Sequence, residues 1–342
     1  MDRAIPISVT RDARIGDAAS DADAADATPN RTIDVGANLE EFLDAARTFS
    51  AQGRRDLAIE TLRRGILAHP RSAELLSTLG DLLSRTGAFE EADLYFRQAL
   101  EYGPLVVEVW YRHGLHQARQ GLGAGARLAY EEVVRLEPRH VRGWVNLGVT
   151  LADLGDREGA LSAVRQAVLL DASCAEARSN LGIQFAEAGM RAEAVEEFRR
   201  AVSLSPQSSE AHCNLGWALL GEDDVEQAEL MLLASVRLDP SKVEGLYALA
   251  LLHLRVGRYT RAVGELKQAI ELSPDDARLH YHLGVAYNNQ EAPDQAILAL
   301  ENAARLKPDD PRVHRLLGVA YDKKELPLRA REAYRRAAAL NG

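Results

Sequence analysis

Three asparagines recur at a spacing of 34 residues, and each begins the same tripeptide Asn-Leu-Gly: Asn146, Asn180 and Asn214. A carboxamide carries both hydrogen-bond donors and an acceptor, so a row of asparagines can pair with the N–H and C=O groups of an extended peptide whatever its side chains. The alternative is that asparagine is merely tolerated on a solvated face. Both interpretations depend on whether the chain is built from repeats.

Aromatic residues follow the same spacing close to these asparagines. Trp217 comes three residues after Asn214, and Tyr247 and Tyr281 are again 34 residues apart. His282 lies two periods after Asn214, so it would continue the row as a hydrogen-bonding group or simply be a surface histidine. Aromatic side chains are frequent interface anchors, and the alternative for these three is core packing.

The sequence contains no combination of residues typical of an enzyme or a metal protein. Cys174 and Cys213 belong to no metal-spaced cluster, and His280 and His282 would point to different sides of a helix. No Ser/His/Asp set or pair of carboxylates stands out from the background. We therefore predict no catalytic activity, no metal and no cofactor, and the net charge of −10 disfavours nucleic acid as a partner.

A 34-residue period extends through most of the chain. Prolines stand at 70, 104, 138, 206, 240, 274 and 308, and Ala172 fills the vacant place. With that proline as position 32, nine repeats begin at Leu39, Ala73, Val107, Val141, Ala175, Ser209, Val243, Ala277 and Pro311. Position 8 is always glycine or alanine, position 20 always alanine and position 24 always bulky and apolar, which predicts two closely packed helices.

The boundary between the two helices of a repeat is also visible. Position 15 is glycine in six repeats, where a left-handed residue would end the first helix: Gly53, Gly87, Gly121, Gly155, Gly189 and Gly257. Pro293 and Pro327 at position 17 suit the first turn of a second helix. Each repeat is therefore predicted to be a helix, a turn and a helix.

This pattern resembles the tetratricopeptide repeat, whose signature is W-x2-L-G-x2-Y followed by A-x3-F, A and P over 34 positions. "WVNLGVTL" begins at residue 144 and "ADLYFRQA" at residue 92. The resemblance covers residues 39–342 and implies an all-α, right-handed superhelical solenoid of nine repeats. The preceding Ala/Asp-rich residues 1–38 are predicted to be a disordered leader.

The resemblance also implies where function lies, because positions 2, 5, 6, 9, 12 and 13 of such repeats line a concave groove. The asparagines would form a ladder there, as in superhelical arrays such as that of O-GlcNAc transferase. Trp217, Tyr247, Tyr281 and His282 would lie beside the ladder. The lysine and asparagine set that binds chaperone C-termini is missing, although Arg112 and Arg142 supply a fragment of it.

We therefore predict a protein–protein interaction scaffold that binds an extended segment of a partner protein. One alternative is self-assembly into homo-oligomers through the ends or the convex face, and a remote one is an accessory subunit of a glycosyltransferase. No apolar run suits a signal peptide or a membrane span, which predicts a cytoplasmic protein, bacterial in character.

The C-terminal end of the chain is basic. The last repeat carries 8 basic and 3 acidic residues, and four arginines crowd its second predicted helix: Arg329, Arg331, Arg335 and Arg336. They would complement the helix dipole and keep the open end of the stack soluble. The alternative is a dock for an acidic protein or an anionic membrane surface.

Overall fold

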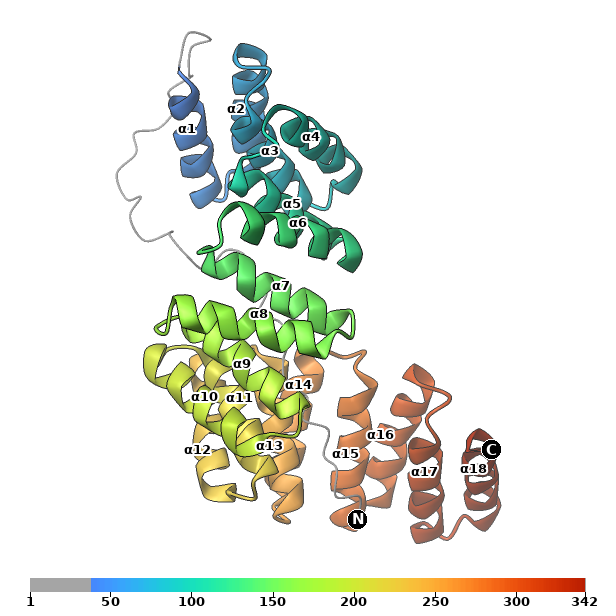
Figure 1. Ribbon diagram of the computed structural model, residues 1–342. Helices are drawn as coiled ribbons and strands as arrows, with labels where there is room; N and C mark the ends of the chain where they lie inside the picture. The colour runs from blue at the N-terminus through green and yellow to red at the C-terminus, as the bar shows by residue number, and fades with distance from the viewer. Residues whose placement is uncertain (1–37, 342) are drawn as a thin grey trace. The chain divides into compact units, whose positions relative to one another are not determined.

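The structure, a computed structural model, describes residues 38–341, which contain eighteen α-helices and no strand (Figure 1). The first helices of the nine repeats are α1 (Leu39–Ala51), α3 (Ala73–Arg85), α5 (Val107–Arg119), α7 (Val141–Asp153), α9 (Ala175–Glu187), α11 (Ser209–Gly221), α13 (Val243–Arg255), α15 (Ala277–Asn289) and α17 (Pro311–Lys323). The second helices are α2 (Arg55–Ala68), α4 (Phe89–Tyr102), α6 (Gly123–Leu136), α8 (Arg157–Leu170), α10 (Arg191–Leu204), α12 (Val225–Leu238), α14 (Tyr259–Leu272), α16 (Pro293–Leu306) and α18 (Pro327–Leu340). The predicted all-α helix-turn-helix repeat is confirmed.

The chain forms two compact units that meet within α9, between Gln184 and Phe185. We call the described residues 38–184 the N-terminal unit and residues 185–341 the C-terminal unit. The two helices of a repeat pack together, as α11 does with α12, and the second helix packs on the next first helix, as α12 does on α13. The predicted leader lies outside the described residues, apart from Asn38.

First helices of successive repeats also touch one another within each unit. α3 contacts α5 in the N-terminal unit, and α11, α13, α15 and α17 make successive contacts in the C-terminal unit. We call the solvent side of these neighbouring first helices the first-helix face. It corresponds to the side on which the sequence places the candidate binding residues.

The turn between the two helices has a left-handed residue at position 15. The six predicted glycines have φ between 71° and 84°, which confirms the expected helix ends. The other three repeats place Asp223, Glu291 and Glu325 at the same position with φ of 68°, 57° and 59°. The backbone of this turn is therefore constant while its side chain varies. Pro293 and Pro327 lie in the first turns of α16 and α18, as predicted.

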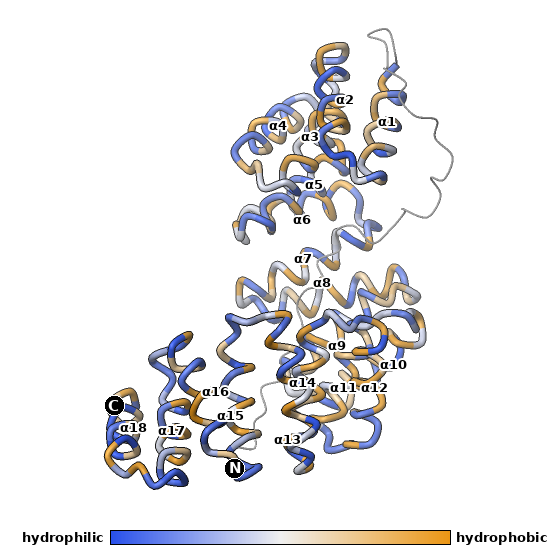
Figure 2. The backbone as a smooth tube through the Cα atoms, turned by 180° about the vertical axis from the view of Figure 1, so that it is seen from behind, coloured by the Kyte–Doolittle hydropathy of each residue, from blue (hydrophilic) through white to orange (hydrophobic). Residues whose placement is uncertain are grey.

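Small residues at position 8 allow the large residues at position 24 to pack between the helices. A Cβ atom added to Gly114 would lie 2.5 Å from Tyr130 Cε1, and one added to Gly216 would lie 2.6 Å from Leu232 Cγ. Apolar and polar residues alternate along the helices (Figure 2), and most of the buried residues are apolar. The predicted pairing of small and large residues is confirmed.

Candidate functional site

The three repeated asparagines are buried, which contradicts the alternative that they are merely tolerated on a solvated face. Asn146 and Asn180 are each 3% exposed and Asn214 is 0% exposed. Asn146 Nδ2 donates to the Tyr111 hydroxyl at 3.2 Å, and Asn180 Nδ2 donates to the Glu176 carbonyl at 3.0 Å. Each contact uses one N–H of the amide and leaves its Oδ1 atom without a hydrogen-bond partner among the described residues.

Trp217 is also buried, at 1% exposure, so of the two interpretations core packing is the one that holds for this residue. Its ring centroid lies 6.2 Å from that of Tyr247, because α11 and α13 pack directly against each other. The indole Nε1 has no hydrogen-bond partner within residues 38–341. This residue is a buried aromatic group with an unused donor.

The other predicted aromatic residues continue from Trp217 as one contiguous row across α11, α13 and α15. Tyr247 and His282 have centroids 5.4 Å apart and Tyr281 and His282 4.9 Å apart, with rings nearly perpendicular. Tyr247 is buried, whereas Tyr281 and His282 are partly exposed. The structure therefore brings these four predicted site residues together within the C-terminal unit.

Two arginines that the sequence analysis missed cover this row. The guanidinium carbon of Arg278 lies 5.1 Å from the centre of the Tyr247 ring, and that of Arg312 lies 5.5 Å from the Tyr281 ring. A guanidinium over an aromatic face is a favourable cation–π contact. We call Tyr247, Arg278, Tyr281, His282 and Arg312 the Arg–Tyr surface.

Aspartates at the starts of α15 and α17 fix these guanidiniums. Asp276 caps the backbone N–H of Arg278 at 2.9 Å and accepts from its Nη2 at 2.7 Å. Asp310 makes the same two contacts to Arg312, at 3.0 Å and 2.7 Å. Glu244 of α13 also accepts from Arg278 Nη2 at 2.9 Å. The motif Asp-x-Arg could have revealed the two arginines in the sequence, because it occurs at the same position of two successive repeats.

His282 is neutral near pH 7. Burial lowers its pKa to about 4, and the positive charges of Arg312 and Arg278 act in the same direction. Its Nδ1 lies 2.9 Å from the Arg278 carbonyl, an acceptor, so this nitrogen carries the proton and Nε2 keeps a lone pair. Burial also raises the pKa of Tyr247 to about 12, which keeps its hydroxyl protonated.

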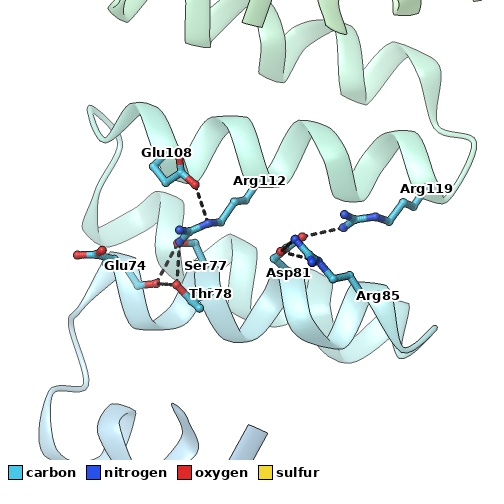
Figure 3. A network of polar contacts seen from close by, with 8 residues as sticks. All are labelled: Glu74, Ser77, Thr78, Asp81, Arg85, Glu108, Arg112 and Arg119. Carbon is cyan, nitrogen blue, oxygen red and sulfur yellow. Dashed lines mark hydrogen bonds and ion pairs between the residues drawn. The ribbon is translucent and has the colours of Figure 1, made fainter. Parts of the chain in front are cut away.

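The N-terminal unit carries a different polar network on its first-helix face (Figure 3). Arg112 Nη1 donates to Ser77 Oγ at 3.1 Å and to Thr78 Oγ1 at 2.8 Å, and its Nε pairs with Glu108 at 2.9 Å. Arg112 is one of the two arginines that supply a fragment of the residue set that binds chaperone C-termini. Its Nη1 group links α3 to α5, and its Nε group pairs with its own helix.

A second group of ion pairs lies one turn further along α3 and two turns further along α5. Asp81 of α3 pairs with Arg85 at 3.0 Å and with Arg119 of α5 at 2.7 Å (Figure 3). Carboxylates therefore balance guanidiniums throughout this patch. Its contacts explain how α3 and α5 are held together, and they leave little charge for a ligand.

The four arginines of the basic end are exposed on α18. Arg329 lies with its guanidinium carbon 5.9 Å from the Tyr321 ring centre. None of the four falls in the last turn of α18, which ends at Leu340, so the predicted complement to the helix dipole is wrong. Their roles in solubility or docking stay predictions.

Within residues 38–341, no group of three or more His, Cys, Asp or Glu side chains is placed to hold a metal ion. No helix in the described part of the chain is long and apolar enough to cross a membrane. The groups gathered on the first-helix face are thus hydrogen-bonding, aromatic and cationic. These are the groups with which proteins bind other polypeptides.

The sequence profile of the tetratricopeptide repeat matches seven overlapping stretches of the chain: residues 43–104, 77–140, 111–171, 145–209, 180–243, 247–311 and 289–342. The chain belongs to the tetratricopeptide repeat family. The predicted family is confirmed by these matches together with the paired helices described above. No curated protein sequence matches this tetratricopeptide protein significantly.

Two solved structures show the same fold at low sequence identity. A chain in the crystal structure of the APC/C hetero-tetramer Cut9–Hcn1 is similar with a TM-score of 0.64 and 18% identity over 82% of this chain. The match spans 55% of that chain, about half its length. A structure from the functional characterization of Pseudomonas aeruginosa PilF is similar with a TM-score of 0.55 and 20% identity, covering 60% of this chain and 94% of that one.

Proposed function

We propose that this tetratricopeptide protein is a non-catalytic scaffold that binds an extended segment of a partner protein on its first-helix face. The repeat fold supports an interaction scaffold in general. The observation that carries the finer proposal is the contiguous row of Trp217, Tyr247, His282 and Tyr281, with two fixed guanidiniums above it. Aromatic and arginine side chains grouped in this way are typical of interface hot spots. The proposal includes the cytoplasmic location predicted from the sequence.

The asparagines enter this proposal as acceptors. Because the Nδ2 atoms of Asn146 and Asn180 already donate within the protein, their Oδ1 atoms are the groups left to accept a backbone N–H. His282 Nε2 is a further acceptor, on the partly exposed part of the row. Tyr281 would then contact the side chains of the bound segment, while the buried rings of Trp217 and Tyr247 pack behind it.

Affinity capture followed by mass spectrometry provides the partner, and a triple variant tests the ladder. Changing Asn146, Asn180 and Asn214 to alanine should weaken partner binding about tenfold or more, since each lost hydrogen bond is worth roughly 0.5–1.5 kcal/mol. Asn302→Ala on the second helix α16 is the matched control and should bind like the wild type. Equal affinities of all three folded proteins would refute the ladder.

The alternative function is self-assembly through the second helices. Leu94 of α4 and Leu128 of α6 occupy the same repeat position and are 53% and 62% exposed, which places neighbouring apolar groups in solvent. Size-exclusion chromatography with light scattering decides between the two functions. A stable oligomer that Leu94→Glu and Leu128→Glu convert to a monomer would favour assembly.

A further inference from the structure

The position-2 side chains of successive first helices change sign along the C-terminal unit. Glu210 and Glu244 occupy this position in α11 and α13, and Arg278 and Arg312 occupy it in α15 and α17. Glu210 pairs with Lys242 at 3.8 Å and Glu244 with Arg278 at 2.9 Å, so the acidic end of this face is balanced and the positive charge in excess lies toward α17. A bound segment with uneven charge would therefore be oriented by this face.

Arg315 adds a third cation at the positive end. It lies three residues after Arg312 on α17, so the two side chains share a side of that helix. Arg315 is exposed and makes no ion pair or side-chain hydrogen bond within residues 38–341. An exposed guanidinium without a carboxylate is a natural site for an added anion.

Arg278 and Arg312 also keep donors in reserve. Their side chains are 47% and 63% exposed although both are paired. The contacts to Asp276, Glu244 and Asp310 use Nε and Nη2 and leave both Nη1 groups without a partner in the described chain. Arg278 already lies between two carboxylates, whereas Arg312 is held by Asp310 alone, and its unused Nη1 is preorganised to bind a second carboxylate.

Half-buried apolar side chains lie about two turns after position 2, on the same side of the first helices. Position 9 is Leu251 in α13, Val285 in α15 and Val319 in α17, and all three are partly exposed. Packed helices are about 8–10 Å apart, and three residues of a polyproline II segment span about 9 Å with their side chains returning to the same side. An extended segment can therefore place a similar residue over each successive first helix.

We propose that Arg312 and Arg315 bind carboxylates of an acidic, extended segment of the partner, whose apolar residues, spaced three apart, contact Val285 and Val319. This inference rests on the proposed function and names the class of segment that the C-terminal unit accepts. The acidic part of the segment lies over α17, and an apolar part continues over α15.

Labelled peptides of about 12 residues provide the test, with the triplet Glu-Ala-Val repeated four times and both ends blocked. Fluorescence anisotropy with the full chain should show the Glu probe binding about tenfold tighter than a Gln-Ala-Val probe. The difference should shrink when the salt concentration is raised from about 50 to 200 mM. A probe of the same composition with its glutamates clustered should bind more weakly than the evenly spaced probe.

Paired variants locate the site. Arg312→Gln with Arg315→Gln should weaken the Glu probe at least about fivefold and leave the Gln probe unchanged. Arg331→Gln with Arg335→Gln removes the same charge from exposed positions of α18 and should change the affinity less than about twofold. Thermal unfolding of both variants shows that each is folded at the assay temperature.

Three outcomes would overturn the inference. The Glu and Gln probes could bind alike, both double variants could lose affinity equally, or phosphatidylserine vesicles could displace the probe and bind only protein with intact Arg312 and Arg315. The last outcome would assign the surface to a membrane. If the asparagine variant still lost its natural partner while the two probes bound alike, the proposed function would stand and the acidic preference alone would fail.

Discussion

Glu325 provides a sharp test of how the turns of this solenoid are built. It has φ of 59°, its side chain is exposed, and it makes no ion pair or side-chain hydrogen bond within the described residues. A left-handed conformation costs a residue with a Cβ about 1–2 kcal/mol, and glycine loses about 0.5–1 kcal/mol more than other residues through its greater freedom when unfolded. Glu325→Gly should therefore raise the free energy of unfolding by about 0.5–1 kcal/mol.

Glu291 and Gly257 supply matched controls. Glu291 has nearly the same φ, but its carboxylate accepts from Lys323 Nζ at 2.9 Å. Glu291→Gly also removes this surface ion pair, so it should raise the free energy of unfolding slightly less than Glu325→Gly does. Gly257 has φ of 76°. Gly257→Ala should lower the free energy of unfolding by about 1 kcal/mol, because it introduces the backbone strain that Glu325→Gly removes.

Urea unfolding followed by circular dichroism measures all three variants. The midpoint should shift without a change in slope, and the thermal midpoint of Glu325→Gly should rise by roughly 1–4 °C. A neutral or destabilising Glu325→Gly with an unchanged slope would refute the reasoning. It would show that the left-handed residue is relieved by a contact other than those described.

Two further predictions concern stability. His253 is buried between Glu265 at 2.7 Å and Glu229 at 3.2 Å; burial alone would lower its pKa, but the two carboxylates outweigh burial and raise it. The raised pKa means that the folded protein binds the proton of His253 more tightly than the unfolded chain does. Urea unfolding should therefore show the free energy of unfolding falling as pH rises from about 6 to 8. A His253→Gln protein whose free energy of unfolding fell equally with pH would contradict this. Gly114→Ala should lower the free energy of unfolding by about 1–3 kcal/mol, because the added methyl group would clash with Tyr130. The methyl group of Gly264→Ala in α14 meets nothing within 4 Å, so this variant should raise the free energy of unfolding by about 0.5–1 kcal/mol. Similar thermal midpoints for the two variants would argue against the packing described.

The repeat period predicted the fold well because it reflects contacts that every unit repeats. The start of α17 at Pro311 and the left-handed glycines follow from local backbone preferences that the sequence carries directly. Asp223 at the same turn shows that the turn backbone can dominate the residue type. A single sequence does not show that an aspartate in place of this glycine keeps the left-handed conformation.

Burial on the first-helix face could not be predicted in the same way. The period places Asn146 and Trp217 on the correct side, but their exposure depends on Tyr111 and Tyr247 of neighbouring first helices. The role of Arg278 likewise depends on a ring that lies 31 positions before it in the sequence. Such contacts join residues across repeats, and they are fixed only when the helices are assembled.

The distribution of tryptophan gives this chain an optical readout of its two units. Trp110 and Trp144 are half-buried in the N-terminal unit, where each indole donates to a backbone carbonyl at 2.9 Å. Trp217, sealed from water, is the one indole of the C-terminal unit within residues 185–341. An indole in a dry environment emits at shorter wavelength than one that meets water. A protein with Trp110→Phe and Trp144→Phe would therefore report, through a single emitter beside Tyr247, both the melting of one half of the molecule and the arrival of a ligand on it.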